Sequence, residues 1–213
     1  GLAGYPLIDV YLTGKELKLA AEVDASVSDF MTTARLYCSG LNFTFNPHRM
    51  ILNKVTDCYL TREDGERIEI QDDQLYRVVT DLYTGQMLGS VMEMSYGLLK
   101  IEPKDKDGNP IENLEDQAIM EGDKELKAWD AIARYMKSFD DTDGNGISNV
   151  PEYYETTHGR KVVDESRNVI DLVKNPNKFS VMIVGIVLVL ILIIILLVVL
   201  IRKLIKKRRR KKK

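Results

Sequence analysis

The sequence FSVMIVGIVLVLILIIILLVVLI occupies residues 179–201 and contains no charged residue. A helix of 23 residues is about 35 Å long, slightly more than the roughly 30 Å hydrocarbon core of a bilayer. A run of Ile, Leu and Val of this length cannot lie exposed to water, and a domain this small has no core deep enough to hold it. The stretch therefore predicts one transmembrane helix.

The residues after the span predict its direction. Ten of the twelve residues at 202–213 are Lys or Arg, and positive charge close to a span stays on the cytoplasmic side. We expect a single-pass plasma-membrane protein with residues 1–178 outside the cell and a cytoplasmic tail. The alternative is a tail-anchored protein with a cytosolic domain, which would require the basic tail to cross the membrane. The tail itself is interpreted as a stop-transfer signal, with recognition of anionic lipids in the inner leaflet as the alternative.

The region before the span is acidic. It holds 20 of the 30 Lys and Arg residues and all 32 Asp and Glu residues, which gives a charge of about −12. An acidic region does not bind nucleic acid through a phosphate-seeking surface, so no nucleic-acid partner is expected. The chain starts Gly1-Leu2-Ala3 with no initiator Met or signal peptide. We therefore expect the C-terminal part of a longer secreted precursor.

Hydrophobic periodicity predicts a mixed α/β (α+β) domain over residues 1–122. The expected strands are 6–13, 34–45, 50–61, 67–70, 75–83 and 98–104, and the expected helices are 15–27 and 125–139. The apolar stripe of the second helix is predicted to be core; it comprises Leu126, Trp129, Ile132, Ala133 and Met136. Residues 123–163 are interpreted as an extension with a helix and a calcium loop, and 164–178 as a juxtamembrane stalk.

The two cysteines lie on the predicted hairpin of strands 34–45 and 50–61. With a turn centred at Pro47-His48, Cys38 and Cys58 would lie opposite each other or one step off register. A cross-strand disulfide is one interpretation. Two buried thiols on neighbouring strands is the other, because directly opposed positions give strained disulfide geometry.

Four segments carry a family resemblance: GYPL at 4–7 with VYLTGKEL at 10–17, LYCSGL at 36–41, FTFNP at 43–47, and LYRVVTDLY at 75–83. In this order they resemble the C-terminal domain of the bifunctional metallophosphatase/5'-nucleotidase family. The resemblance covers about residues 4–104. It implies a substrate-binding domain that serves an N-terminal metallophosphatase domain with a dimetal centre, and that N-terminal domain is absent from this sequence.

The resemblance also implies a substrate site. In the family two aromatic rings of this domain hold the nucleobase, and Tyr83 matches one of them, while Tyr37 is the substitute nearest the other. The alternative is that both are strand aromatics of the core. Residues 84–89 lack the acidic residue found after the second aromatic in well-known members, which leaves the identity of the substrate open. His48 and His158 have no ligand partners at metal spacing and are interpreted as surface residues.

Residues 141–152, DTDGNGISNVPE, match the twelve-residue calcium loop D-x-D-x-N-G-x5-E. The oxygen ligands would come from Asp141, Asp143, Asn145, the carbonyl of Ile147, and Glu152. Pro151 and the lack of a second such loop weigh against calcium, and a solvated turn rich in Asp and Asn is the alternative. A bound Ca²⁺ would stiffen the extension.

These observations favour the nucleotide- or nucleoside-binding C-terminal portion of a cell-surface 5'-nucleotidase-like hydrolase in nucleotide catabolism. This chain alone is expected to lack catalytic residues. The alternative is a non-catalytic surface binding, adhesion or spacer module anchored by a single span.

Overall fold

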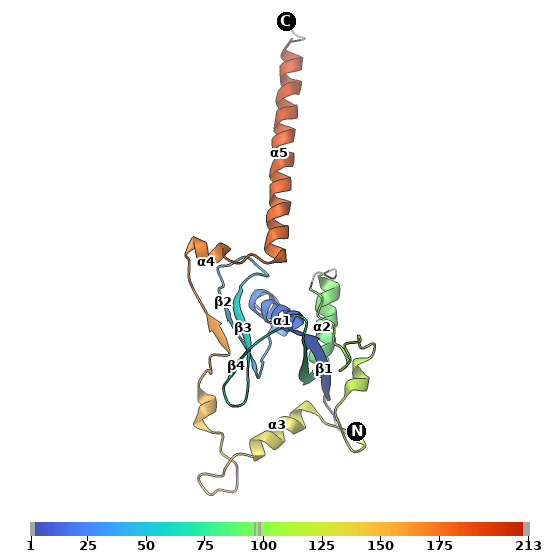
Figure 1. Ribbon diagram of the computed structural model, residues 1–213, viewed down its shortest axis with the longest axis vertical. Coiled ribbons are helices and arrows are strands. Elements are labelled where there is room, and N and C mark those ends of the chain that lie inside the picture. Colours follow the sequence, from blue (N-terminus) through green and yellow to red (C-terminus); the bar gives the residue numbers. More distant parts are fainter. Residues whose placement is uncertain (1–2, 96, 98, 211–213) are drawn as a thin grey trace.

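The computed structural model describes residues 3–95, 97 and 99–210. A small α+β domain carries one long helix, α5 (Lys178–Arg210), which projects away from it (Figure 1). The mixed α/β architecture expected from the sequence is confirmed.

The first sheet pairs β1 (Leu7–Thr13) with β5 (Leu75–Asp81) in antiparallel register, from Leu7 opposite Asp81 to Thr13 opposite Leu75. In β1 every second side chain is buried, and these are Ile8, Val10 and Leu12. This period of two is the alternation that the sequence predicts for a half-buried strand.

Helix α1 (Gly14–Val27) follows β1 without a loop. Its start is a capping box: the Thr13 hydroxyl accepts from the Glu16 N–H, and the Glu16 carboxylate accepts from the Thr13 N–H. Gly14 is required here, because a Cβ would lie 2.0 Å from the carbonyl oxygen of Gln71. The helix buries one side against Leu12 and Ile101 and another against Phe43.

The second sheet has the order β4-β3-β2-β8. Its strands are β2 (Leu41–Phe45), β3 (Val55–Thr61), β4 (Arg67–Glu69) and β8 (Lys161–Val163). The predicted β2–β3 hairpin is confirmed. Strand β8 joins β2 in parallel from more than 100 residues away in the sequence, which no local pattern indicated.

Two predicted strands are corrected, and one helix was not predicted. Strand 34–45 is limited to 41–45, because a 3-10 helix η1 (Thr32–Ala34) and Gly40, with φ +84°, interrupt it. Residues 99–104 form no strand, and Lys104 makes isolated bridges to Tyr11 and Pro110; Leu98 lies outside the described residues. Helix α2 (Leu82–Met94) was missed, since its two glycines hide the period, but Asp81 caps it by accepting from the Thr84 N–H.

In the observed hairpin register, Cys38 and Cys58 do not lie opposite each other as expected. Cys58 lies opposite Phe43, with a bulge between Thr44 and Phe45, while Cys38 precedes β2. Both cysteines are free thiols. The turn is longer than the Pro47-His48 turn assumed from composition, which moved the register.

Residues 105–118, which include η2 (Leu114–Gln117), lie along β1, and Ile111 and Leu114 pack against the cluster of Ile8, Val10 and Leu82. Residues 119–160 form an extension at the end opposite α5, with the elements β6 (Met120–Glu121), β7 (Lys124–Glu125), α3 (Ala128–Lys137) and η3 (Glu152–Glu155). Helix α3 is shorter than predicted. Its apolar stripe is not core: Trp129, Ile132 and Met136 are exposed, Ile132 to 61%.

Residues 164–178 do not form a free stalk. They contain α4 (Val169–Val173) and bond to the domain: the buried guanidinium of Arg49 donates to the carbonyl oxygens of Asp171 and Lys174, at 2.9 and 2.6 Å. Phe179, the first residue of the apolar run, is buried in the core. The sequence did not indicate these bonds, because a polar composition does not reveal backbone carbonyls that are bound by a residue distant in the sequence.

Candidate substrate-binding site

Tyr83 lies in the first turn of α2, at the end of the molecule opposite α5. Its side chain is 41% exposed, and its ring packs against that of Tyr5 with centroids 5.5 Å apart and planes tilted by 37°. The β1–β5 register continues to this pair, since the Leu82 N–H donates to the Pro6 carbonyl oxygen at 2.9 Å. Sequence reasoning did not assign Tyr5 to the site, although extending the antiparallel register by two positions would have found it.

Tyr37 lies apart from this pair. It is 88% exposed in the loop before β2, with the ammonium of Lys161 5.5 Å from its ring centroid. That ammonium is an ion-pair partner of Asp24 at 2.8 Å. Among the aromatic contacts of the described residues, none joins Tyr37 to Tyr83. The structure therefore does not form the two-ring clamp from these side chains, and both remain predicted substrate contacts.

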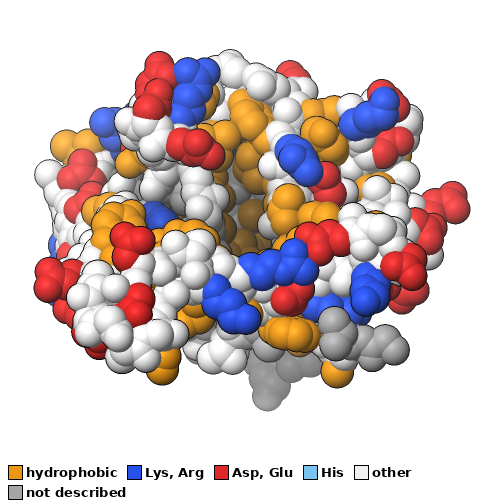
Figure 2. All heavy atoms as spheres, turned by 90° about the horizontal axis from the view of Figure 1, so that it is seen from below, with side chains coloured by type: hydrophobic (Ala, Val, Ile, Leu, Met, Phe, Trp, Pro, Cys, Tyr) orange, Lys and Arg blue, Asp and Glu red, His pale blue; other side chains and the backbone are white. Residues whose placement is uncertain are grey.

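The end of the molecule that carries Tyr83 is hollowed. Figure 2 views the molecule from below, with α5 behind, and shows a hollow in the middle of this face with hydrophobic side chains in its walls. A separate apolar cavity between α1 and α2, lined by Val23, Leu36 and Leu88, has a volume of only about 30 Å³. It has room for about one water and none for a base.

Neither histidine has a metal-ligand environment. The His158 ring stacks on Tyr153 with centroids 3.7 Å apart, and His48 accepts from Arg167 at 3.4 Å. Within residues 3–95, 97 and 99–210, no three His, Cys, Asp or Glu side chains converge as metal ligands.

The loop at 141–152 is closed by its own hydrogen bonds. The Asp141 carboxylate accepts from the N–H groups of Gly144 and Gly146, each at 2.8 Å. These bonds, that of Gly146 foremost, lower the pKa of Asp141. Asn145 donates to Asp143 at 2.9 Å, and Glu152 opens η3. Calcium binding by Asp141, Asp143, Asn145, Ile147 and Glu152 stays a prediction.

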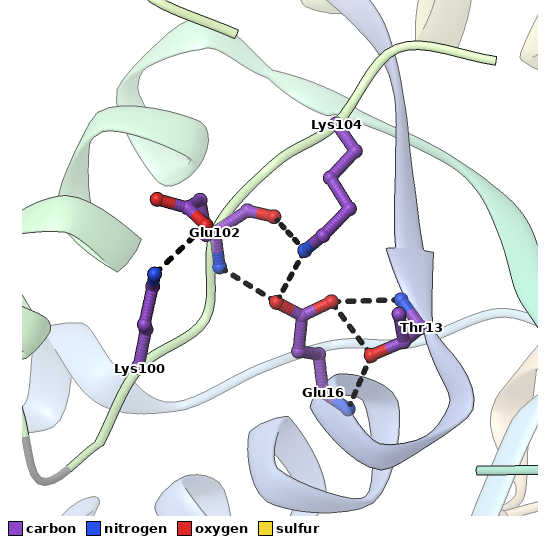
Figure 3. A network of polar contacts seen from close by, with 5 residues as sticks. All are labelled: Thr13, Glu16, Lys100, Glu102 and Lys104. Carbon is purple, nitrogen blue, oxygen red and sulfur yellow. Dashed lines mark hydrogen bonds and ion pairs between the residues drawn. The ribbon is translucent and has the colours of Figure 1, made fainter. Parts of the chain in front are cut away.

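A polar network joins α1 to residues 100–104 (Figure 3). The Glu16 carboxylate accepts from the Lys104 ammonium at 2.6 Å and from the Glu102 N–H at 3.1 Å. Burial alone would raise the pKa of Glu16, but the Lys104 and Thr13 hydrogen bonds outweigh it and hold the pKa below its ordinary value. On the hairpin, burial raises the pKa of the Cys58 thiol to about 12.

Comparison with known proteins indicates the class of this domain. Residues 3–95 match the family described as 5'-nucleotidase, C-terminal domain. This match supports the assignment of that segment, which holds β1 to α2 together with Tyr5 and Tyr83, to the 5'-nucleotidase C-terminal domain family. No curated protein matches the chain.

Two solved structures are similar to the chain. One is a 5'-nucleotidase precursor from Thermus thermophilus, 19% identical, with a TM-score of 0.48 over 76% of this chain and 26% of that one. The other is the NAD nucleotidase of Haemophilus influenzae, 21% identical, with a TM-score of 0.34 over 48% and 19% of the two chains. The present chain therefore spans about a quarter or less of the length of these proteins.

Proposed function

We propose that this chain is the substrate-binding C-terminal part of a membrane-anchored 5'-nucleotidase-like phosphoester hydrolase. The catalytic dimetal centre would belong to an N-terminal metallophosphatase domain outside this sequence. The observation that carries the proposal is the exposed Tyr5–Tyr83 pair within the segment that matches the family. Exposed rings offer a stacking surface for a nucleobase, and such stacking is worth about 1–3 kcal/mol per base.

In this proposal the residues of this chain bind and orient the substrate. Tyr83 stacks on the base from α2, and Tyr37 contacts the substrate from the loop before β2 when the catalytic domain is present. The apolar side chains around the hollow, with the exposed stripe of α3, are the surface on which the N-terminal domain would rest. Hydrolysis itself would be carried out by the metal domain, and the released nucleoside would be available for uptake.

The anchoring part of the proposal rests on α5. Residues 178–207 form the one helix of the described chain that is long and apolar enough to cross a membrane, and its most apolar 18 residues have a mean hydropathy of 3.9. With the basic tail in the cytoplasm, the domain would lie on the outer surface. Protease digestion of sealed vesicles tests this orientation: the tail should be protected and the domain cleaved.

The binding role is tested by titrating the full chain in detergent with adenosine and AMP, by calorimetry. Tyr83→Ala should weaken binding about tenfold or more, because one stacking face is lost. Tyr153→Ala is the matched control, since Tyr153 is also an exposed tyrosine, at 56%, but lies in η3. Equal affinities for the wild type and both variants would contradict a role for Tyr83.

A folded chain that binds neither ligand at millimolar concentration would favour the second candidate, a non-catalytic surface or spacer module. The observation in favour of that candidate is that Tyr37 and Tyr83 are not brought together. Attaching the upstream metallophosphatase domain should restore binding and phosphatase activity if the first proposal is correct.

A further inference from the structure

A cavity of about 850 Å³ lies beside the base of α5. Its walls come from α1, from β3, from residues 97 and 100–104 and from residues 175–179. It is separate from the Tyr5–Tyr83 pair, which lies at the opposite end of the domain. The volume is within the range of small-molecule sites.

The start of α5 fixes the depth of this cavity relative to a bilayer. Phe179 and Ser180 are 4% and 5% exposed because they lie inside the domain. The apolar residues of α5 outside the domain are 181–201. As a helix they are roughly 32 Å long, which is close to the thickness of the hydrocarbon core. The domain end that holds the cavity therefore lies in the headgroup layer of the membrane that α5 crosses.

The junction cannot easily move away from this position. Asn177 donates to the carbonyl oxygen of Leu52, and its own side-chain oxygen accepts from the N–H groups of Phe179 and Ser180. The Ser180 hydroxyl is buried at the same place and has no hydrogen-bond partner among the described residues. The connection between domain and helix is thus a fixed joint that holds the cavity wall at one height.

The carboxylates in the cavity wall are already engaged. Glu16 accepts from Lys104, and Glu22 accepts from Ser26 and from the backbone of residues 54 and 55. Asp57 and Glu69 both pair with Arg67, and Glu102 pairs with Lys100 at 3.0 Å.

Two lysines of the cavity wall are not paired with a carboxylate of the described residues. Lys15, at the start of α1, and Lys178, at the start of α5, form no salt bridge within the described chain. The Lys178 ammonium lies 4.7 Å from the ring centroid of Phe179, which is in the same wall. These two ammonium groups are therefore available to a ligand, and an ammonium is a suitable point-charge partner for phosphate.

We propose that this cavity receives the phosphate-bearing headgroup of a phospholipid from the leaflet in which α5 begins, with Lys15 and Lys178 as the phosphate ligands. The inference rests on the proposed membrane insertion of α5 and goes beyond it. The bound headgroup would fix the orientation of the domain on the membrane, and with it the direction in which the Tyr83 end faces.

The test uses the full chain in nanodiscs of phosphatidylcholine and phosphatidylglycerol, released into native mass spectrometry to count the lipids retained. The wild type should retain one phospholipid, and the double variant Lys15→Glu/Lys178→Glu should retain it about tenfold less often. The control Lys124→Glu/Lys137→Glu makes the same charge change in the distal extension and should behave as the wild type. Urea unfolding should show that all three proteins are folded and unfold cooperatively, because neither lysine of the cavity has an ion pair to lose.

Equal lipid retention in the cavity variant and the control would overturn the inference. Titration of the chain in detergent with inorganic phosphate separates a lipid site from an anion site: binding of phosphate that needs both lysines, without lipid retention, would also overturn it. Carbonate extraction of vesicles separates this outcome from failure of anchoring. A chain that carbonate removes overturns both proposals, while an integrated chain that retains no lipid overturns only this one.

Discussion

The two ends of the domain are built differently. At the end next to α5, polar side chains are buried and bonded over long sequence distances: Asn46 donates to the Ser166 carbonyl oxygen at 2.7 Å, and Arg49 binds carbonyls more than 120 residues away. In the distal extension, α3 and η3 bury no residue, and the loop at 141–152 is held by bonds between residues at most eleven apart. The α5 end is therefore held by buried tertiary contacts. At the other end, α3 is attached at its start, where Ala128 and Trp129 donate to the carbonyl oxygens of Tyr5 and Ala3, and the loop that follows is held by local bonds.

This difference indicates what each end is for. A buried guanidinium is costly unless its donors are satisfied, so its retention at the α5 end favours a joint that must keep one geometry. The distal end instead leaves Trp129, Tyr135 and Tyr153 in solvent. Exposed aromatic surface is typical of a place where another surface binds. The following predictions test this contrast, from the largest expected effect to the smallest.

Removing an aromatic ring from the core should give the largest difference in stability from a substitution in the distal extension. Phe43 is 1% exposed beneath α1, so Phe43→Ala should lower the free energy of unfolding by about 3–5 kcal/mol. Ile132→Ala on the exposed stripe of α3 should change it by less than about 0.5 kcal/mol. Urea unfolding followed by circular dichroism measures both. A large loss from Ile132→Ala would mean that the stripe is packed in solution.

The Arg49 joint should be the next most sensitive feature. Arg49→Ala removes the donors to three backbone carbonyls, those of Asn53, Asp171 and Lys174, and should cost about 2–3 kcal/mol. Proteolysis should then cleave near residues 164–178, which lose their attachment. Arg62→Ala, which breaks only an exposed ion pair with Glu66, should cost about 0–1 kcal/mol. If both variants are equally stable, the joint does not depend on Arg49.

The Glu16 network should make this end sensitive to acid. The folded pKa of Glu16 is lowered, so its stabilising contribution is present above the unfolded pKa and is lost as pH falls through the folded value. The stability difference between wild type and Glu16→Gln should therefore be full at pH 7 and shrink below about pH 4.5. Glu63→Gln, in an exposed turn, is the matched control for replacing a glutamate by glutamine. A difference that is constant from pH 3 to pH 7 would contradict the assignment.

Calcium should have the smallest effect, confined to the distal end. If the 141–152 loop binds Ca²⁺, calorimetry should give a Kd of about 10⁻⁴–10⁻³ M, as for weak extracellular sites. Asp141→Asn should abolish the heat of binding, and Asp123→Asn, outside the loop, should not. Absence of heat with the wild type would leave the loop as a turn closed by its own Asp and Asn side chains.

Local pattern was sufficient for several elements. Alternation placed β1 and β5, the Thr13–Glu16 spacing is the signature of the cap on α1, and the uncharged run predicted α5. These features depend on residues a few positions apart, so periodicity and capping chemistry report them directly. Helix α2 was not predicted because its glycines weaken the helical periodicity of the apolar residues. The prediction of strand 98–104 was wrong because a buried extended segment has the composition of a strand, whether or not it pairs with another strand.

Other features were decided by tertiary structure alone. The sequence by itself determined that a mixed α/β domain with a family-like segment precedes an apolar helix, and that Tyr83 is a candidate contact. Only the folded chain paired Tyr83 with Tyr5, separated Tyr37 from both, left the stripe of α3 exposed, and attached residues 164–178 to Arg49. The physical reason is that an amphipathic stripe or a buried cation shows that a residue needs a partner, while which partner it meets depends on contacts between segments distant in the sequence.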